Sequence, residues 1–471
     1  MSRFLLRAAF VIAALLPCAA KTAPPVQLEV RGTWLTTTAN HALRTAADTA
    51  ASMRRLKDIG INTVYVEAWK DGHAQFPSQI LRTTTGDAIA VRDLLQESLI
   101  EAHRNGLVYV AWFEYGFMAA QKSTMNRLRL GKPEWLSRDI HGSEIAPNGF
   151  VWLNPLHPEA RAFLRDLVLE AVDNYDIDGI QLDDRIVWPH VTMGYDDYTQ
   201  QAYASEHAGR RPPADHTDPE WMRWRADKVS EFARLFVQEI RTRRPGLLIS
   251  LSPAVYPWSW DNYLLDWPAW SGWGEAQRLS SGQFRDPRSA LALPRWDEFI
   301  PQAYRFSYEA FEKTWRAQVD AVRKLGADRQ RDLVAGIRIT GDGADSSWDQ
   351  LRRSILLTRE LGNGGHVLWY SRGVLDLYAA ELAAFYRASG PAWPPHFGAG
   401  WRAPATALVR TGRVVGGVKW RLPPGGPRSY RLIGRSAAGW EYLPMLGRQG
   451  RSVVLPVRFR QVELLLDRRG G

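Results

Sequence analysis

Segments typical of β-strands alternate with segments typical of helices along most of the chain, and this alternation limits the folds open to it. Short runs such as 61–69 show the two-residue period of a strand, and longer stretches such as 219–244 show the helical period. The strand-like segments are 29–38, 61–69, 107–116, 177–184, 247–255, 298–305, 333–340 and 364–373. Strands alternating with helices imply a parallel sheet. Eight such units, without a glycine-rich dinucleotide turn, predict a closed (β/α)8 TIM barrel.

The first twenty residues have the composition of an export signal. Arg3 and Arg7 precede the apolar run FVIAALL, and Cys18-Ala19-Ala20 offers small residues for cleavage. We therefore expect 1–20 to be a signal peptide and the protein to be exported, periplasmic or secreted. A lipoprotein anchored at Cys18 is the alternative, although Pro17 stands where a small residue is usual. No later stretch is long and apolar enough to span a bilayer.

The remaining chain divides into a large and a small domain. Residues 21–388 contain the barrel units, and the Pro/Gly-rich stretch 389–400 reads as a linker. Residues 401–471 alternate apolar and polar residues over short runs, which predicts a small β-sandwich-like accessory domain. The pattern leaves open whether this domain binds glycan or only packs on the barrel.

Composition narrows the class of partner. The single cysteine, Cys18, falls in the expected signal peptide, so the mature chain would lack disulfides, a cysteine nucleophile and thiolate metal ligands. The formal net charge of +10 indicates either a solvated basic surface or attraction to anionic envelope polymers, and an export signal argues against nucleic acid. The 21 tryptophans favour a carbohydrate ligand, because sugar rings stack on aromatic faces. Five of them crowd into 258–273, a stretch expected to be loop-rich and too dense in rings to be buried as a whole.

Three acidic side chains fall at the ends of consecutive predicted strands. Glu67, Glu114 and Asp183 take inward positions on the second, third and fourth strands. The C-terminal ends of barrel strands are where this fold places catalysis. Neighbouring strands lie about 4.8 Å apart, so these carboxyl groups can reach the separations of about 5 to 9 Å that glycosidase pairs use.

The neighbours of these carboxylates suggest different roles. Glu114 stands among Trp112 and other aromatic residues, and an apolar setting would raise its pKa and suit a general acid/base. Asp183 has polar neighbours, which suit a nucleophile or a stabiliser of the oxocarbenium ion, and Asp184 would position Asp183 or a sugar hydroxyl.

The sequence allows two roles for Glu67. It is either an alternative acid/base or a salt-bridge partner of Arg31 or Arg338.

Aromatic and polar residues near the strand ends are candidates for substrate binding. They are Glu67, Trp69, Trp112, Tyr115, Gln181, Arg185, Trp188, Trp258, Gln302, Tyr304, Arg338 and Tyr370. Carboxylate chemistry of this kind requires no cofactor and no metal.

Several motifs resemble one known family. RGTWLTT, AWFEYGFM, WLNPLHPEAR, YDIDGIQLDDR, DPEWMRWRADK and PQAYR occur in an order similar to the glycosyl hydrolase-like 10 family of exported bacterial proteins. The resemblance covers roughly 28–375 and implies a (β/α)8 barrel, glycosidase activity and, for members with a known role, cleavage of peptidoglycan glycan strands. Asp183 and Asp184 match the family's DGI-x-x-DD pattern, which also resembles the fourth-strand nucleophile motif of amylase-type barrels. Arg185 replaces an aromatic residue or histidine, and Glu67 has no clear counterpart.

Two other functions are compatible with the same residues. One is a non-catalytic glycan-binding protein on a barrel scaffold. The other is a metal-dependent hydrolase in which Asp183, Asp184 and a histidine hold the ion. The lack of an H-x-x-x-H spacing disfavours the metal-dependent hydrolase.

Overall fold

The computed structural model describes residues 27–273, 294–324, 327–398, 404–423, 431–443 and 451–465. The predicted signal peptide, 1–20, lies outside these residues. None of the described helices combines the length and the apolar character needed to cross a membrane.

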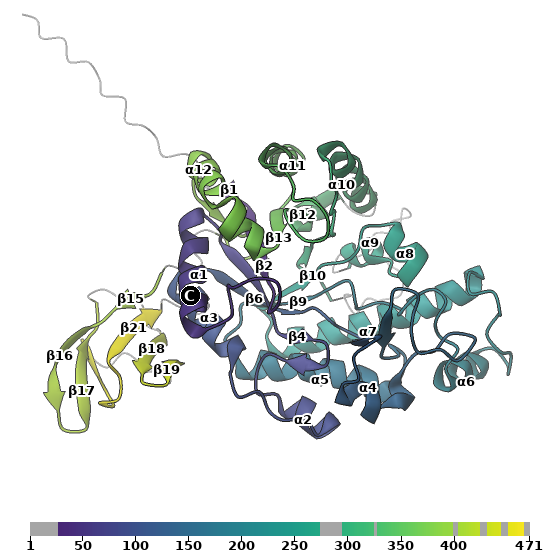
Figure 1. Ribbon diagram of the computed structural model, residues 1–471, viewed down its shortest axis with the longest axis horizontal. Coiled ribbons are helices and arrows are strands. Elements are labelled where there is room, and N and C mark those ends of the chain that lie inside the picture. The colour runs from purple at the N-terminus through teal and green to yellow at the C-terminus, as the bar shows by residue number, and fades with distance from the viewer. Residues whose placement is uncertain are drawn as a thin grey trace, which may run out of the picture.

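Eight parallel strands form the central sheet, as the alternation predicted (Figure 1). In spatial order they are β11 (Glu298–Phe299), β10 (Leu248–Leu251), β9 (Gly179–Leu182), β6 (Val108–Phe113), β3 (Thr63–Glu67), β2 (Val30–Leu35), β13 (Gly365–Trp369) and β12 (Val334–Arg338). Parallel bridges from Phe299 to Leu333 and from Gln302 to Gly336 join the first strand of this order to the last. The sheet is therefore a barrel, and the (β/α)8 prediction is confirmed.

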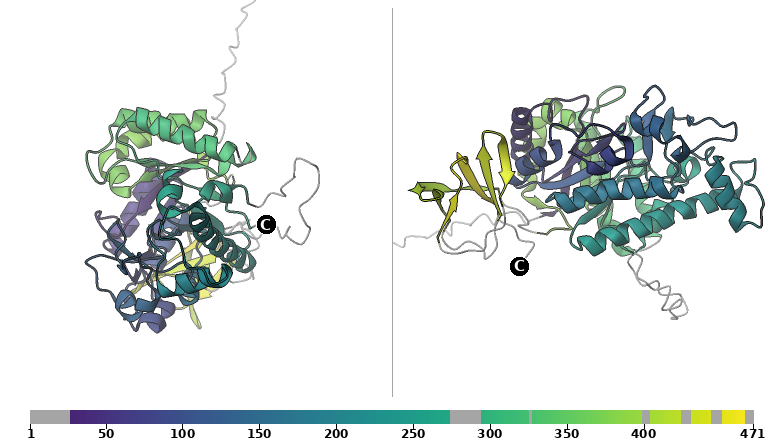
Figure 2. Two further views of the ribbon diagram at one scale, coloured as in Figure 1. Left: turned by 90° about the vertical axis from the view of Figure 1, so that its right-hand side faces the viewer. Right: turned by 90° about the horizontal axis from the view of Figure 1, so that it is seen from below.

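Helices surround this sheet on its outer side (Figure 2). The long ones are α1 (Ala46–Ile59), α3 (Leu94–Arg104), α5 (Pro158–Asn174), α7 (Pro219–Arg243), α10 (Tyr308–Arg323), α11 (Trp348–Glu360) and α12 (Ala379–Ser389). Most begin at a side chain that caps the first turn; Asp218, for example, accepts a hydrogen bond from the backbone of Trp221 at 3.0 Å.

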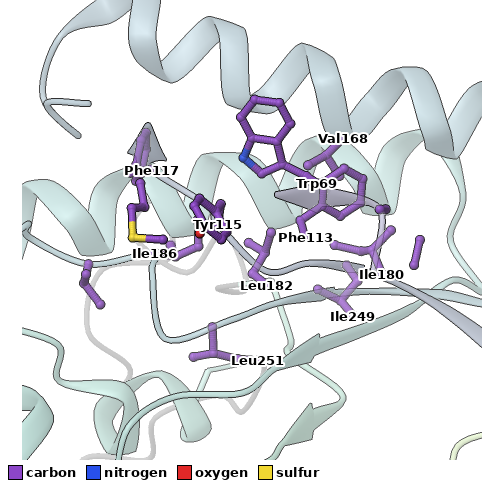
Figure 3. Packing of buried hydrophobic residues seen from close by; sticks show 14 of the residues in the cluster. Trp69, Phe113, Tyr115, Phe117, Val168, Ile180, Leu182, Ile186, Ile249 and Leu251 are labelled. Atoms are coloured by element: carbon purple, nitrogen blue, oxygen red, sulfur yellow. The ribbon is translucent and has the colours of Figure 1, made fainter. Parts of the chain in front are cut away.

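The strands alternate between two apolar layers. Val64 and Val66 pack outward against the helices, whereas Tyr65 lies in the barrel interior. Figure 3 shows the outer layer, where Ile180 and Leu182 of β9 lie beside other apolar side chains. The same alternation leaves Gln181 and Asp183 on the inner side.

Insertions on the C-terminal side of the strands build the rim of the barrel mouth. After β6 the chain forms the antiparallel pair β7 (Met118–Gln121) and β8 (Phe150–Trp152). The tryptophan-rich stretch after β10 is not irregular, because it folds into α8 (Trp258–Tyr263) and α9 (Trp267–Ser271). Trp267 and Trp270 are buried core residues there, while Trp258 is 49% exposed.

The C-terminal part is a small two-sheet unit, as predicted. One sheet has the order β15 (Thr406–Ala407), β21 (Gln461–Leu465), β18 (Arg431–Ser436) and β19 (Gly439–Tyr442), and the other has β16 (Val409–Val414), β17 (Gly417–Arg421) and β20 (Ser452–Leu455). All pairs are antiparallel and a separate apolar cluster fills the unit. Within the expected linker, β14 (Ala392–Trp393) pairs in parallel with β1 (Gln27–Leu28).

Candidate active site

Three carboxylates meet at the mouth of the barrel because their strands end at the same height. Glu67 is the last residue of β3 and pairs in register with Trp112, while Phe113 pairs with Leu182. Glu114 and Asp183 each follow directly after those paired positions. Glu67 is fully buried, and Glu114 and Asp183 are 8% and 4% exposed. The predicted clustering of these three side chains is therefore present.

Lys70 joins two of these carboxylates. Its Nζ lies 3.1 Å from Glu67 Oε2 and 3.2 Å from Glu114 Oε2, and it also donates to the hydroxyl of Thr38 at 3.1 Å. Thr37 donates to Glu67 from its backbone nitrogen at 3.1 Å and from its hydroxyl. Glu67 is thus held from two sides at the floor of the mouth.

Arg185 joins the other carboxylates. Its Nη1 lies 3.1 Å from Asp183 Oδ2, 3.7 Å from Glu114 Oε1 and 3.7 Å from Asp184 Oδ1. The same nitrogen donates to the carbonyl oxygen of Glu114 at 2.7 Å, and the guanidinium lies over the Tyr115 ring. Because one nitrogen contacts both, the carboxylate oxygens of Asp183 and Glu114 are at most about 7 Å apart, which is no farther than glycosidase pairs reach.

Asp183 has an environment that favours its protonated form. Burial raises its pKa well above the ordinary value, and the neighbouring charges of Asp184 and Glu114 act in the same direction against the opposing effect of Arg185. Gln302 fixes the carboxylate by donating to Oδ1 at 2.7 Å, and its amide also reaches the carbonyl of Ser252 at 3.1 Å. Burial raises the pKa of Asp184 as well.

Glu67 also titrates at an unusual pH. Burial is the largest cause and the charge of Glu114 the second, and together they raise its pKa to about 7. Lys70 and the hydrogen bonds from Thr37 oppose this rise. Four carboxylates and two cations share the mouth, so the site tends to retain protons near neutral pH.

Aromatic rings from several strands pack together inside the barrel. Trp34 lies 6.5 Å from Trp112 and 5.8 Å from Trp369, and Tyr304 stacks on Trp369 at 5.7 Å between ring centroids. Trp369 and Tyr304 are half-buried, so part of each ring is open to a ligand, whereas Trp112 is buried beneath them. Tyr370 packs on Trp369 and donates its hydroxyl to the carbonyl of Ala39. Aromatic surfaces of this kind suit the apolar faces of sugar rings.

Some residues predicted to bind substrate lie elsewhere. Trp69 is fully buried against Phe163, and Trp188 is fully buried with its indole nitrogen donating to the carbonyl of Met193 (Figure 3 for Trp69). Gln181 is also fully buried, since it accepts from the Trp34 indole at 2.7 Å inside the barrel. These three predictions of substrate contact are wrong, as is that for Trp112, which is 1% exposed. Strand alternation does not fix side-chain direction beyond the strand end and does not reveal depth in the barrel.

Two further expectations about the charges need correction. Glu114 does not have an apolar setting, because Phe113 and its other aromatic neighbours pack into the core while its carboxylate faces Lys70 and Arg185. Glu67 does not pair with the arginines proposed for it. Arg31 binds Glu29 at 2.8 Å.

Arg338 lies on β12 and donates to the carbonyl of Asp342 at 2.7 Å, with its guanidinium over the Phe306 ring. It is 5% exposed, and among the described residues it forms no ion pair with a carboxylate of the mouth. Trp258 lies on α8 against Tyr263, at 5.2 Å between centroids, and its exposed face leaves its predicted role open to test.

Comparison with known proteins places this geometry in a family. The glycosyl hydrolase-like 10 model matches residues 29–298, more than half of the chain. The chain belongs to the glycosyl hydrolase-like 10 family. Its enzyme class is therefore that of a glycosidase, as the motifs predicted.

This glycosyl hydrolase-like 10 protein is also similar to individual glycoside hydrolases. The glycosyl hydrolase DigH of Escherichia coli strain K12 is 27% identical over 371 residues, which covers 67% of this chain and 80% of DigH. The glycoside hydrolase domain of PgaB (BpsB) from Bordetella bronchiseptica is similar in fold, with a TM-score of 0.56 at 16% identity over 78% of this chain and 99% of that domain. The catalytic domain of β-amylase from Paenibacillus polymyxa has a TM-score of 0.50 at 11% identity, over 77% of this chain and 98% of that domain.

Sequence reasoning missed several residues of this family member's site. Lys70 contacts two carboxylates, yet it lies beyond the end of β3 in a short hairpin with β5 (His73–Ala74), where alternation no longer predicts direction. Trp34 could have been found, because it takes an inward position on β2 as Tyr65 does on β3. Trp369 ends β13 in the same way.

Proposed function

We propose that this protein hydrolyses glycosidic bonds in a cell-envelope polysaccharide, specifically the glycan strands of peptidoglycan, with Asp183 and Glu114 as the catalytic carboxylate pair. The observation that carries the proposal is the shared contact of both carboxylates with Arg185 at the barrel mouth. It supports a pair close enough to act on the two sides of one glycosidic bond.

The charges around the pair favour a division of roles opposite to the one expected from sequence. Asp183 is the group whose pKa is raised by burial and by Asp184, so it suits the proton donor to the leaving oxygen. Glu114 lies between the cations Lys70 and Arg185, which contact its two carboxylate oxygens and hold the group in place. Glu114 then serves as the nucleophile or base, and Asp184 keeps the proton near Asp183.

The substrate and the location rest on separate support. The family resemblance supports peptidoglycan glycan, and the half-buried rings of Tyr304 and Trp369 support a polymer of sugar rings. The signal-like residues 1–20 support export to the periplasm or the exterior, with a lipoprotein as the alternative.

Aryl glycosides of N-acetylhexosamines with good and poor leaving groups test the roles. We expect Asp183→Asn to lose most activity on the poor leaving group and to retain much more on the good one, because a good leaving group needs no proton. Glu114→Gln should lose activity on both by about a hundredfold to ten-thousandfold. Asp349→Asn and Glu381→Gln, exposed on α11 and α12, serve as matched controls. Equal losses of Asp183→Asn on both substrates would contradict the assigned roles.

The binding-protein alternative has its own outcome. If the parent binds denuded peptidoglycan but leaves it intact, the barrel is a glycan-binding scaffold and the proposed catalysis fails. If Asp183→Asn and Glu114→Gln both cleave at the parent rate, another pair carries the reaction.

A further inference from the structure

The C-terminal unit has a charge distribution that the active site does not explain. Its described residues carry nine arginines and lysines but only two acidic residues, Glu441 and Glu463. Glu463 binds Arg104 of the barrel through two bonds of 2.7 and 2.8 Å, and Glu441 contacts Arg458. The family model ends at residue 298, so it does not cover this unit.

Much of this positive charge gathers on the sheet formed by β16, β17 and β20, here called the β16 sheet. Five cations belong to it or border it: Arg410, Arg413, Lys419, Arg421 and Arg451. All are exposed, and no ion pair with another described residue is recorded for any of them. All six residues of β16 are exposed, and β16 pairs with β17 alone, so solvent reaches both sides of this edge strand.

The β16 sheet does not resemble a surface that stacks neutral sugars. The aromatic side chains of the described part of the unit are Trp420, Phe459, Trp440 and Tyr442, and each of them is buried or half-buried. Trp440 lies beneath the Arg104 guanidinium at 4.1 Å. The exposed apolar side chains are valines, such as Val409, which are small for insertion into a membrane.

The unit is held on the side of the barrel away from the mouth. Arg104 ends α3, and Arg431 binds Asp176, which precedes β9, at 2.7 Å. His103 and Tyr442 are joined at 2.6 Å, next to Asp178 at the start of β9. Figures 1 and 2 show the unit beside α3, projecting from the barrel. A ligand on the β16 sheet would therefore lie away from the proposed active site at the mouth.

We infer that the β16 sheet is a docking surface for an anionic polysaccharide, separate from the active site. Arginine forks suit carboxylate and phosphate groups, and several exposed cations on the two faces of one small sheet attract a polymer that repeats such groups. A polysaccharide is favoured over nucleic acid or membrane because this inference rests on the proposed function, in which the barrel cleaves a sugar polymer. Docking would hold the enzyme on an acidic polymer while the mouth remains free.

The full chain can be tested by affinity electrophoresis in gels containing polygalacturonate, with dextran as the neutral polymer. The triple variant Arg413→Gln, Lys419→Gln, Arg421→Gln is compared with Arg54→Gln, Arg211→Gln, Lys313→Gln, which removes the same charge from exposed barrel positions. We expect polygalacturonate to retard the parent and the control variant, and the β16-sheet variant to lose about tenfold or more in apparent affinity. Retardation of the parent should fall with added salt, and dextran should have no effect.

Other outcomes overturn the inference. The cations of an edge strand also prevent edge-to-edge pairing. If that is their only role, the β16-sheet variant aggregates, while its monomer fraction is retarded like the parent. Equal losses in both variants, or retention by phosphatidylglycerol vesicles or duplex DNA but not by polygalacturonate, also contradict it. Activity on aryl glycosides should be unchanged in the β16-sheet variant, so failure of docking and failure of the proposed catalysis remain distinguishable.

Discussion

At the scale of single residues, a chain of alternating charges organises the mouth. Lys70 stands between Glu67 and Glu114, and Arg185 stands between Glu114 and Asp183. Each cation lowers the repulsion between carboxylates that the barrel forces together. The sequence predicted the carboxylates, because their strands keep a two-residue period up to the last residue. It missed Lys70, which follows β3 in a short hairpin where loop geometry decides direction, and it named Arg185 only as a substrate-binding candidate, not as the link between Asp183 and Glu114.

Glu67 should make stability depend on pH. Its folded pKa of about 7 exceeds the ordinary value of 4.5, so the folded state keeps a proton that the unfolded chain releases. The stability contributed by this proton is present below the ordinary value and is lost as pH rises toward 7. We expect the free energy of unfolding of the parent to fall by up to about 3 kcal/mol between pH 4.5 and pH 7 because of this group. The free energy of unfolding of Glu67→Gln should fall by less.

Chemical denaturation at several pH values measures this effect. Glu381→Gln, on the exposed side of α12, is the matched control and should follow the parent. A Glu67→Gln variant whose stability changes with pH as steeply as that of the parent would refute the assigned titration.

At the scale of elements, the ends of β6 and β9 fit together through a glycine. Gly116 has a φ of +45°, and a Cβ there would lie 2.5 Å from the carbonyl oxygen of Arg185. Phe117 donates to that same oxygen at 3.0 Å. The close approach therefore sets where Arg185 stands relative to Glu114.

Gly116→Ala should both destabilise the protein and weaken catalysis. The added methyl group forces apart two backbones, at a cost of about 1 to 3 kcal/mol. Thermal unfolding and kcat measure the two effects, and Gly131→Ala, with open space around its Cβ, is the control. Unchanged kcat in Gly116→Ala would show that this contact does not position Arg185.

The order and approximate positions of the elements were predictable, although the predicted strand 298–305 is only Glu298–Phe299. The packing of the tryptophans was not predictable. The predicted strand 61–69 is observed as Thr63–Glu67, and the predicted helix 219–244 as Pro219–Arg243. The stretch 258–273 lacks a clear period because α8 and α9 are each only a turn or two long. The sequence therefore predicts an exposed loop for the tryptophans of this stretch, although Trp267 and Trp270 are buried.

At the scale of the whole molecule, the barrel and the C-terminal unit are joined by charged and apolar contacts at α3. Arg104 binds Glu463 and Glu101, and Ile100 packs with Ile433 and Leu465. We expect Arg104→Gln to lower stability by about 1 to 3 kcal/mol and to speed proteolysis between the two parts. Arg54→Gln, exposed on α1, is the control. A digestion rate equal to the parent's would show that Arg104 does not hold the unit in place.

Metal dependence is also a property of the whole enzyme. Among the residues that the structure describes, no group of three or more His, Cys, Asp or Glu side chains could hold a metal ion. Acid/base chemistry by Asp183 and Glu114 requires none. Activity should therefore persist in excess EDTA, and loss that Zn²⁺, Mg²⁺ or Mn²⁺ restores would favour a metal-dependent hydrolase.

The central claim is that Asp183 and Glu114 cleave glycan strands at the barrel mouth. Its most direct test is mass spectrometry of the soluble products released from denuded peptidoglycan by the parent, Asp183→Asn, Glu114→Gln and the control Asp349→Asn. We predict sugar fragments with new reducing ends from the parent and the control, and at least about a hundredfold less from the two site variants. Intact glycan with every protein, or equal release by the site variants, would contradict the claim.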